Sequence, residues 1–154
     1  MSGPAARAAS VTRAALRHCL DQGWAPLAEV PLPDGSRADI LALRPDGGLV
    51  IIEVKSCARD FLADAKWPGY AAWCDAFLFA VDGDFPLALL PEGVGVLLAE
   101  DRAAALWRAP AAHALAPARR RALTLGFARL AATRLAGALD PEGAAERRAA
   151  LRAR

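Results

Sequence analysis

Lysine is almost absent from this chain of 154 residues. Of its 19 basic residues, 17 are arginine, and only Lys55 and Lys66 are lysine. The arginine-rich, alanine-rich composition indicates a coding bias that supplies arginine wherever a generic positive charge is enough. A lysine that persists under such a bias is a candidate for a role that needs a compact ammonium group, which a planar guanidinium does not replace. Chance is the alternative explanation, because two residues are a small sample.

Cysteine is scarce, and long apolar runs are missing. Cys19, Cys57 and Cys74 are widely spaced and odd in number, which argues against a disulfide framework and fits a reduced compartment. No Cys/His pair has the spacing of zinc ligands. No apolar run approaches the ~20 residues that span a bilayer, and residues 1–17 lack the apolar segment of a secretory signal. We therefore expect a cytoplasmic protein without a membrane partner.

Charge is unevenly distributed along the chain. Residues 1–100 hold 8 basic and 13 acidic residues, whereas residues 101–154 hold 11 arginines and 4 acids. A basic C-terminal third on an acidic body can attract a polyanion such as nucleic acid. The alternative is a solvated helix face whose arginines serve solubility.

The length and the pattern of apolar residues predict one α/β domain over residues 1–139, followed by a charged, flexible tail over residues 140–154. Apolar periodicity predicts helices at 5–22, 58–67 and 117–139, and strands at 25–32, 37–43, 49–56, 76–81, 94–99 and 103–108. Short turns make the first three strands antiparallel neighbours, and a helix returns the fourth strand in parallel. The predicted fold is a mixed sheet flanked by helices, with an extra C-terminal helix.

Three charged residues lie in apolar surroundings on the second and third predicted strands. Glu53 and Lys55 share one face of their strand, because successive side chains alternate. The turn at residues 44–48 folds the two strands into a hairpin, which brings Asp39 to the same edge. Because four apolar residues precede Glu53, the strand is expected to be buried there, and buried charges need a partner or a metal. The alternative is an ordinary Glu–Lys surface pair.

Two carboxylates and a lysine at one edge can perform metal-assisted hydrolysis. Mg²⁺, or Mn²⁺ in its place, takes hard oxygen ligands, which Asp39, Glu53 and the backbone carbonyl of Val54 could supply. The metal would polarise a phosphodiester and lower the pKa of an attacking water. Lys55 could orient that water or stabilise charge in the transition state.

The spacing of these residues resembles the core motif of the PD-(D/E)xK nuclease superfamily. Asp39, a gap of 13 residues and Glu53-Val54-Lys55 match that motif, although Ala38 stands where a proline is usual. The strand order resembles the restriction-endonuclease-like αβββαβ core of the superfamily. The resemblance implies a Mg²⁺-dependent nuclease whose metal ligands are Asp39 and Glu53.

Further site residues follow from the same resemblance. Related nucleases often carry Gln-x-x-x-Tyr on the helix after the motif, and Lys66 and Tyr70 occupy a similar place here, which makes both of them candidate DNA contacts. Many also carry an acid near the first helix, for which Glu29 is the nearest candidate and thus a possible further metal ligand. Asp60 and Asp64, four residues apart on one helix face, could join the site or simply cap and solvate the helix.

A closer resemblance covers nearly the whole chain. It is to the MmcB-type DNA repair proteins of bacteria, which are themselves similar to PD-(D/E)xK nucleases. The matching segments are Leu32-Pro33-Asp34-Gly35, Arg37-Ala38-Asp39, Glu53-Val54-Lys55-Ser56, Asp60-Phe61-Leu62-Ala63-Asp64, Lys66-Trp67-Pro68 and Trp73-Cys74-Asp75. This resemblance implies a role in DNA repair.

The sequence therefore predicts a Mg²⁺-dependent DNA endonuclease of DNA repair. The last long helix begins with three arginines at the positive end of its dipole, Arg119, Arg120 and Arg121. Their position is unfavourable for the helix and therefore favours a role in phosphate binding. Lys66 is expected to share that role. The alternative is a nuclease-fold DNA-binding or scaffold protein with little or no catalysis, acting with a repair partner. A homodimer is a further possibility, and a plain α/β interaction domain requires the three charged residues to coincide by chance.

Overall fold

The computed structural model describes residues 3–154. Its strands are β1 (Ala25–Pro31), β2 (Arg37–Leu43), β3 (Leu49–Val54), β4 (Ala76–Asp82), β5 (Gly95–Glu100) and β6 (Ala103–Arg108). Its helices are α1 (Pro4–Asp21), α2 (Ala58–Ala63), α3 (Pro117–Leu139) and α4 (Pro141–Arg152), with 3-10 helices η1 (Trp67–Trp73) and η2 (Leu87–Leu89). None of the helices within residues 3–154 is long and apolar enough to cross a membrane.

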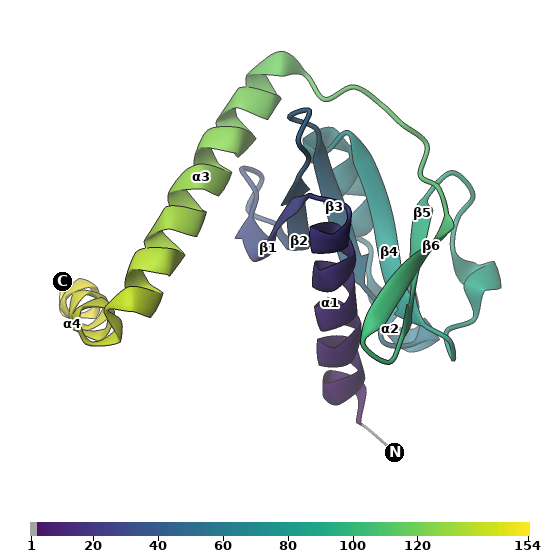
Figure 1. Cartoon of the computed structure of the whole chain (residues 1–154), viewed down its shortest axis with the longest axis horizontal. Helices are drawn as coiled ribbons and strands as arrows, with labels where there is room; N and C mark the ends of the chain where they lie inside the picture. Colours follow the sequence, from purple (N-terminus) through teal and green to yellow (C-terminus); the bar gives the residue numbers. More distant parts are fainter. Residues whose placement is uncertain (1–2) are drawn as a thin grey trace.

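The six strands form one mixed sheet in the order β1-β2-β3-β4-β5-β6 (Figure 1). β1, β2 and β3 are antiparallel neighbours, as the short turns predict. β4 lies parallel to β3 after the crossover through α2 and η1, and β5 continues in parallel before β6 turns back. The predicted α/β fold, with a mixed sheet, flanking helices and an extra C-terminal helix, is confirmed.

Alternating side chains of the central strands build a core on each face of the sheet. On one face, Ile40, Val50 and Ile52 pack with the apolar stripe of α1. On the other face, Leu41, Ile51 and an aromatic cluster pack under α2, η1 and α3. Asp39 and Glu53 alternate in step with Leu41 and Ile51 along β2 and β3, so they lie toward the α2 and η1 side. Lys55, the first residue after β3, continues this alternation.

The segment between β3 and β4 differs from the helix predicted over residues 58–67. α2 ends at Ala63, before the predicted end at residue 67, because Asp64 takes an extended backbone conformation. Residues Trp67–Trp73 then form a 3-10 helix. The interruption gives Asp64 the freedom to turn toward β3.

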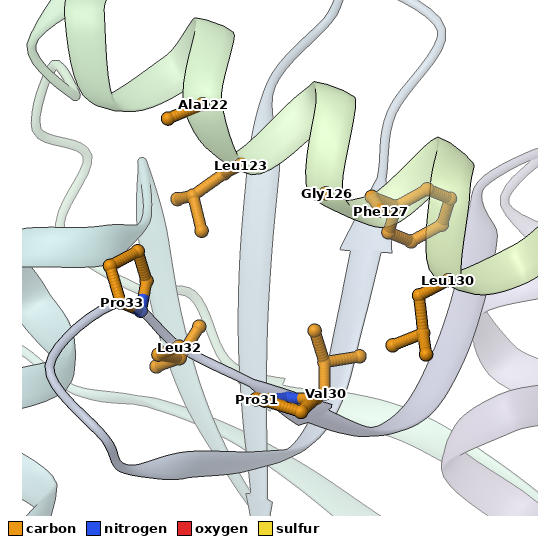
Figure 2. Close-up of a pocket in the computed structure, with 9 residues that line it drawn as sticks. All are labelled: Val30, Pro31, Leu32, Pro33, Ala122, Leu123, Gly126, Phe127 and Leu130. Carbon is orange, nitrogen blue, oxygen red and sulfur yellow. The ribbon is translucent and has the colours of Figure 1, made fainter. Parts of the chain in front are cut away.

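α3 runs beside β1, and α4 lies at the far end of α3, away from the sheet (Figure 1). The inner side of α3 places Leu123, Phe127 and Leu130 over residues 30–33, where they line a hollow of about 330 Å³ (Figure 2). Residues Pro141–Arg152 are helical. Flexibility of residues 140–154 and the single-domain boundary at residue 139 stay predictions.

Candidate active site at the parting ends of β2 and β3

Asp39 and Glu53 meet where β2 and β3 stop pairing. The last backbone pair of the two strands joins Ile40 to Ile52. Beyond this pair, the two carboxylates replace strand carbonyls as hydrogen-bond acceptors. Val54 N donates to Asp39 Oδ2 at 2.8 Å, and Asp39 N donates to Glu53 Oε1 at 3.0 Å. The two acids predicted from the sequence are therefore brought together and held in fixed orientations, each with a second oxygen to which no N–H of residues 3–154 donates.

Burial makes this pair of acids electrostatically unusual. Glu53 is only 4% exposed, and burial together with the adjacent Asp39 charge raises its pKa to about 8. Burial also raises the pKa of Asp39 above its ordinary value. Neighbouring carboxyl groups with raised pKa values are typical of catalytic and metal-binding sites, where a cation or a proton relieves the repulsion.

Lys55 lies in the same site and forms an ion pair with Asp64. Its side chain is 6% exposed, and Nζ donates to Asp64 Oδ2 at 2.6 Å. Burial alone would raise the pKa of Asp64, but hydrogen bonds from Lys55 and from the backbone N–H of Lys66 hold that pKa below its ordinary value. Of the two roles open to Asp64 in the sequence, the structure places it in the site.

The charged residues border an open hollow of about 440 Å³. The residues that line it come from α1, β1, β2, the end of β3 and α2, and are Ala8, Thr12, Ala28, Glu29, Asp39, Glu53, Val54, Lys55 and Asp60. Asp60 accepts a hydrogen bond from the Ser56 backbone N–H at 3.2 Å, which orders the turn into α2. The hollow gives a substrate or hydrated ion access to the carboxylates.

Glu29 lines the same hollow through an irregular point of β1. Its backbone φ of 51° lies in the left-handed region, which is rare for glutamate and interrupts the pairing of β1 with β2 opposite Asp39. Its carboxylate lies 3.7 Å from Arg37, and both side chains are well exposed. Arg134 of α3 donates to the carbonyls of Ala28 and Glu29 and so covers the irregularity. No sequence signal distinguishes Arg134 from the other exposed arginines.

Lys66 and Tyr70 have different environments. Lys66 is exposed and adjoins the site, because its backbone N–H donates to Asp64 Oδ1 at 2.8 Å. Tyr70 is 5% exposed, and its hydroxyl donates to the Arg37 carbonyl at 3.0 Å. Burial, followed by the nearby charge of Glu53, raises the pKa of Tyr70 to about 12. Tyr70 thus supports the underside of the site, and its burial does not favour the predicted DNA contact.

The three consecutive arginines of α3 lie away from the carboxylates. Both terminal nitrogens of Arg120 donate to Asp75 at 2.7 Å, and Asp75 is bonded to Leu49 at the start of β3, the end opposite Glu53. Arg119 lies over the Trp73 ring at 4.6 Å and donates to a carbonyl of η1. The structure therefore gives Arg120 a structural partner and does not bring this arginine cluster to the site.

The donor set suits a hydrated Mg²⁺ better than a metal enclosed by protein ligands. Within residues 3–154, no three Cys, His, Asp or Glu side chains lie close enough together to hold a metal. Mg²⁺ commonly binds through one or two carboxylates and keeps several waters or substrate oxygens. Asp39 and Glu53 supply two hard oxygen donors whose mutual repulsion a cation would relieve, and the Val54 carbonyl is a third candidate donor.

The fold and the site define a class: an α/β protein with a helix-β-β-β-helix-β core and a partly buried group of two acids and a lysine where β2 and β3 stop pairing. The family model "DNA repair protein MmcB-like" matches residues 2–142, so the chain belongs to the MmcB-like family, and membership supports a role in DNA repair. The solved structure of the "SPO1766 protein of unknown function from Silicibacter pomeroyi" is similar, with 42% identity, a TM-score of 0.84 and coverage of 92% of this chain and 95% of that chain. No curated protein matches.

Proposed function

We propose that this protein is a Mg²⁺-dependent endonuclease that cleaves phosphodiester bonds in DNA during repair. One observation carries the proposal: Asp39 and Glu53 are gathered with Lys55 around a single open hollow, although all three are partly or fully buried. Their spacing and strand positions resemble the PD-(D/E)xK nucleases, and membership of the MmcB-like family supports DNA as the substrate.

The residues of the chain have separate roles in this proposal. Asp39 and Glu53 would hold Mg²⁺, with the Val54 carbonyl as a third donor. The bound ion would polarise the phosphodiester and lower the pKa of the attacking water, and Mn²⁺ could replace it. Backbone N–H groups already orient both carboxylates, which favours binding. Lys55, fixed by Asp64, would orient the water or stabilise charge on the phosphate.

DNA would approach the site along exposed cations. Lys66 is the exposed lysine next to Asp64, so it is the proposed phosphate contact nearest the site. Arg119 is also exposed and would contact a more distant part of the DNA. Arg120 is bound by Asp75, and Arg121 lies on the flank of α3 beside Leu125, so neither is assigned to phosphate here.

The proposal is tested by cleavage of branched, single-stranded and damaged DNA with Mg²⁺ or Mn²⁺. Asp39→Asn should reduce cleavage to background, and Lys55→Met should slow it about 100-fold or more. Asp21→Asn changes an exposed acid at the end of α1 and is the matched control, with unchanged activity expected. Cleavage that persists equally in Asp39→Asn and Lys55→Met would refute the catalytic assignment.

A second candidate function is DNA binding with little or no catalysis, in which the protein acts with a repair partner. The 2.6 Å ion pair between Lys55 and Asp64 favours it, because a lysine whose charge is already neutralised contributes less to a transition state. Salt-sensitive DNA binding without cleavage, with either metal and on every substrate, would select this function.

A further inference from the structure

α3 carries two apolar faces, and only one of them is covered. The inner face packs Leu123, Phe127 and Leu130 over residues 30–33 (Figure 2). The outer face consists of residues that are all exposed; we call it the α3 seam, and its members are Leu125, Ala128, Ala132, Leu135 and Leu139. At 100° per residue these two faces lie on opposite sides of the helix.

The spacing of the α3 seam is that of a helix-pairing surface. Its members recur at intervals of three, four, three and four residues, which is the a/d pattern of helices that pack side by side. Leu125 is 61% exposed, Leu135 62% and Leu139 79%. Single exposed leucines are ordinary, but an apolar row of this period over four turns of one helix is not.

The charges at the two ends of α3 indicate which partner fits the α3 seam. Arg121 lies four residues before Leu125 and extends the row at its N-terminal end, whereas Asp140 and Glu142 follow its C-terminal end. An antiparallel copy of α3 would place Arg121 against the Asp140–Glu142 segment of the second molecule, and the reverse contact would form at the other end. A parallel copy would instead place Arg121 on Arg121, which is unfavourable.

We infer that the α3 seam is the interface of a two-fold symmetric dimer in which α3 packs antiparallel against α3 of a second copy of this chain. With the two-fold axis near residue 130, Leu125 faces Leu135 of the second copy, and Ala128 faces Ala132. The small alanines at the centre allow the helix backbones to approach closely, and antiparallel packing aligns the helix dipoles favourably. This inference does not depend on nuclease activity.

Light scattering after size-exclusion chromatography of the full chain, over a range of concentrations, tests the interface. The unaltered chain should form a dimer at micromolar concentrations. The double variant Leu125→Glu/Leu135→Glu should be a monomer with unchanged far-UV circular dichroism, because both side chains lie outside the core. The control Leu20→Glu, an equally exposed leucine on α1, should stay dimeric. Two results would overturn the inference. One is an unaltered chain that is monomeric at every concentration, which would leave the α3 seam to another partner. The other is a double variant that is still a dimer.

Charge reversal tests the antiparallel direction. Arg121→Glu should weaken the dimer at least tenfold by placing three acids together at each end of the interface. Adding Glu142→Arg should restore most of the lost affinity, since the exchanged pair attracts again. A dissociation constant that ignores Arg121→Glu, or a double variant that is weaker than either single variant, would overturn the antiparallel arrangement.

Discussion

Replacing Asp75 should be among the most destabilising single changes of an acidic side chain in this fold. Its carboxylate accepts hydrogen bonds from the backbone N–H groups of Leu49 and Leu115 and from both terminal nitrogens of Arg120. It thereby joins the start of β3 and the start of β4 to the segment that leads into α3. Hydrogen bonds from Arg120, offset in part by burial, hold the pKa of Asp75 below its ordinary value, so the carboxylate is charged at neutral pH.

The magnitude follows from the groups that lose their partner. In Asp75→Asn, an amide N–H₂ group replaces one carboxylate oxygen and faces the N–H donors that this oxygen accepted from. Each buried N–H that loses its acceptor costs about 1–3 kcal/mol. Because the Arg120 side chain is 34% exposed, loss of the ion pair adds only a modest amount. We expect a total of about 3–5 kcal/mol, a large part of the stability of a small domain.

Urea unfolding at pH 7 measures this cost. Arg120→Met should cost about 2 kcal/mol, and the control Arg13→Met, a change of an exposed arginine on α1, should stay within about 0.5 kcal/mol. The stabilisation by Asp75 should also fade as the pH falls below the ordinary carboxyl pKa, because its lowered pKa means that the unfolded chain takes up the proton first. An Asp75→Asn variant as stable as Arg13→Met would refute the proposed attachment of α3 through Asp75.

Three further predictions concern the site. Without divalent metal, the free energy of unfolding should fall as the pH rises from about 5 to 8, by at most about 1.4 kcal/mol per pH unit, because Glu53, with a pKa near 8, keeps its proton to a higher pH in the folded chain than in the unfolded chain. Glu53→Gln should flatten this slope in thermal or urea unfolding. An unchanged slope would contradict the raised pKa of Glu53. Asp64→Ala should cost about 3–5 kcal/mol in urea unfolding by leaving the Lys55 ammonium buried and unpaired, and a cost below about 1 kcal/mol would show the pair to be unimportant. Lys66→Ala should leave stability unchanged but weaken DNA binding and lower its salt dependence by about one counterion, whereas an unaltered salt dependence would remove Lys66 from the DNA contact.

The position of the acid–acid–lysine group could be predicted because short-range rules determine it. The tight turn at residues 44–48 forces β2 to pair with β3, and the apolar residues around Asp39 and Glu53 fix which strands are central. Alternation then places both acids and Lys55 on one face. No information from distant parts of the chain is needed for these steps.

The remaining site contacts depend on tertiary structure that a local pattern does not encode. Asp64 reaches Lys55 only because α2 ends at Ala63, whereas the apolar pattern favours a longer helix. Arg134 donates to the carbonyls of Ala28 and Glu29, which lie more than 100 residues earlier in the sequence. The contact depends on the positive φ of Glu29, which the residue type does not predict. Arg120 is a surface cation by sequence, and only the packing of α3 gives it Asp75 as a partner.

Anomalous diffraction from a crystal of the protein soaked in Mn²⁺ tests the central claim most directly, because it locates the ion independently of activity. We expect a single strong peak between the carboxylates of Asp39 and Glu53, within about 2.0–2.3 Å of an oxygen of each, and the loss of that peak in Asp39→Asn. A map without a peak at these two acids, or a peak that persists unchanged in Asp39→Asn, would contradict it.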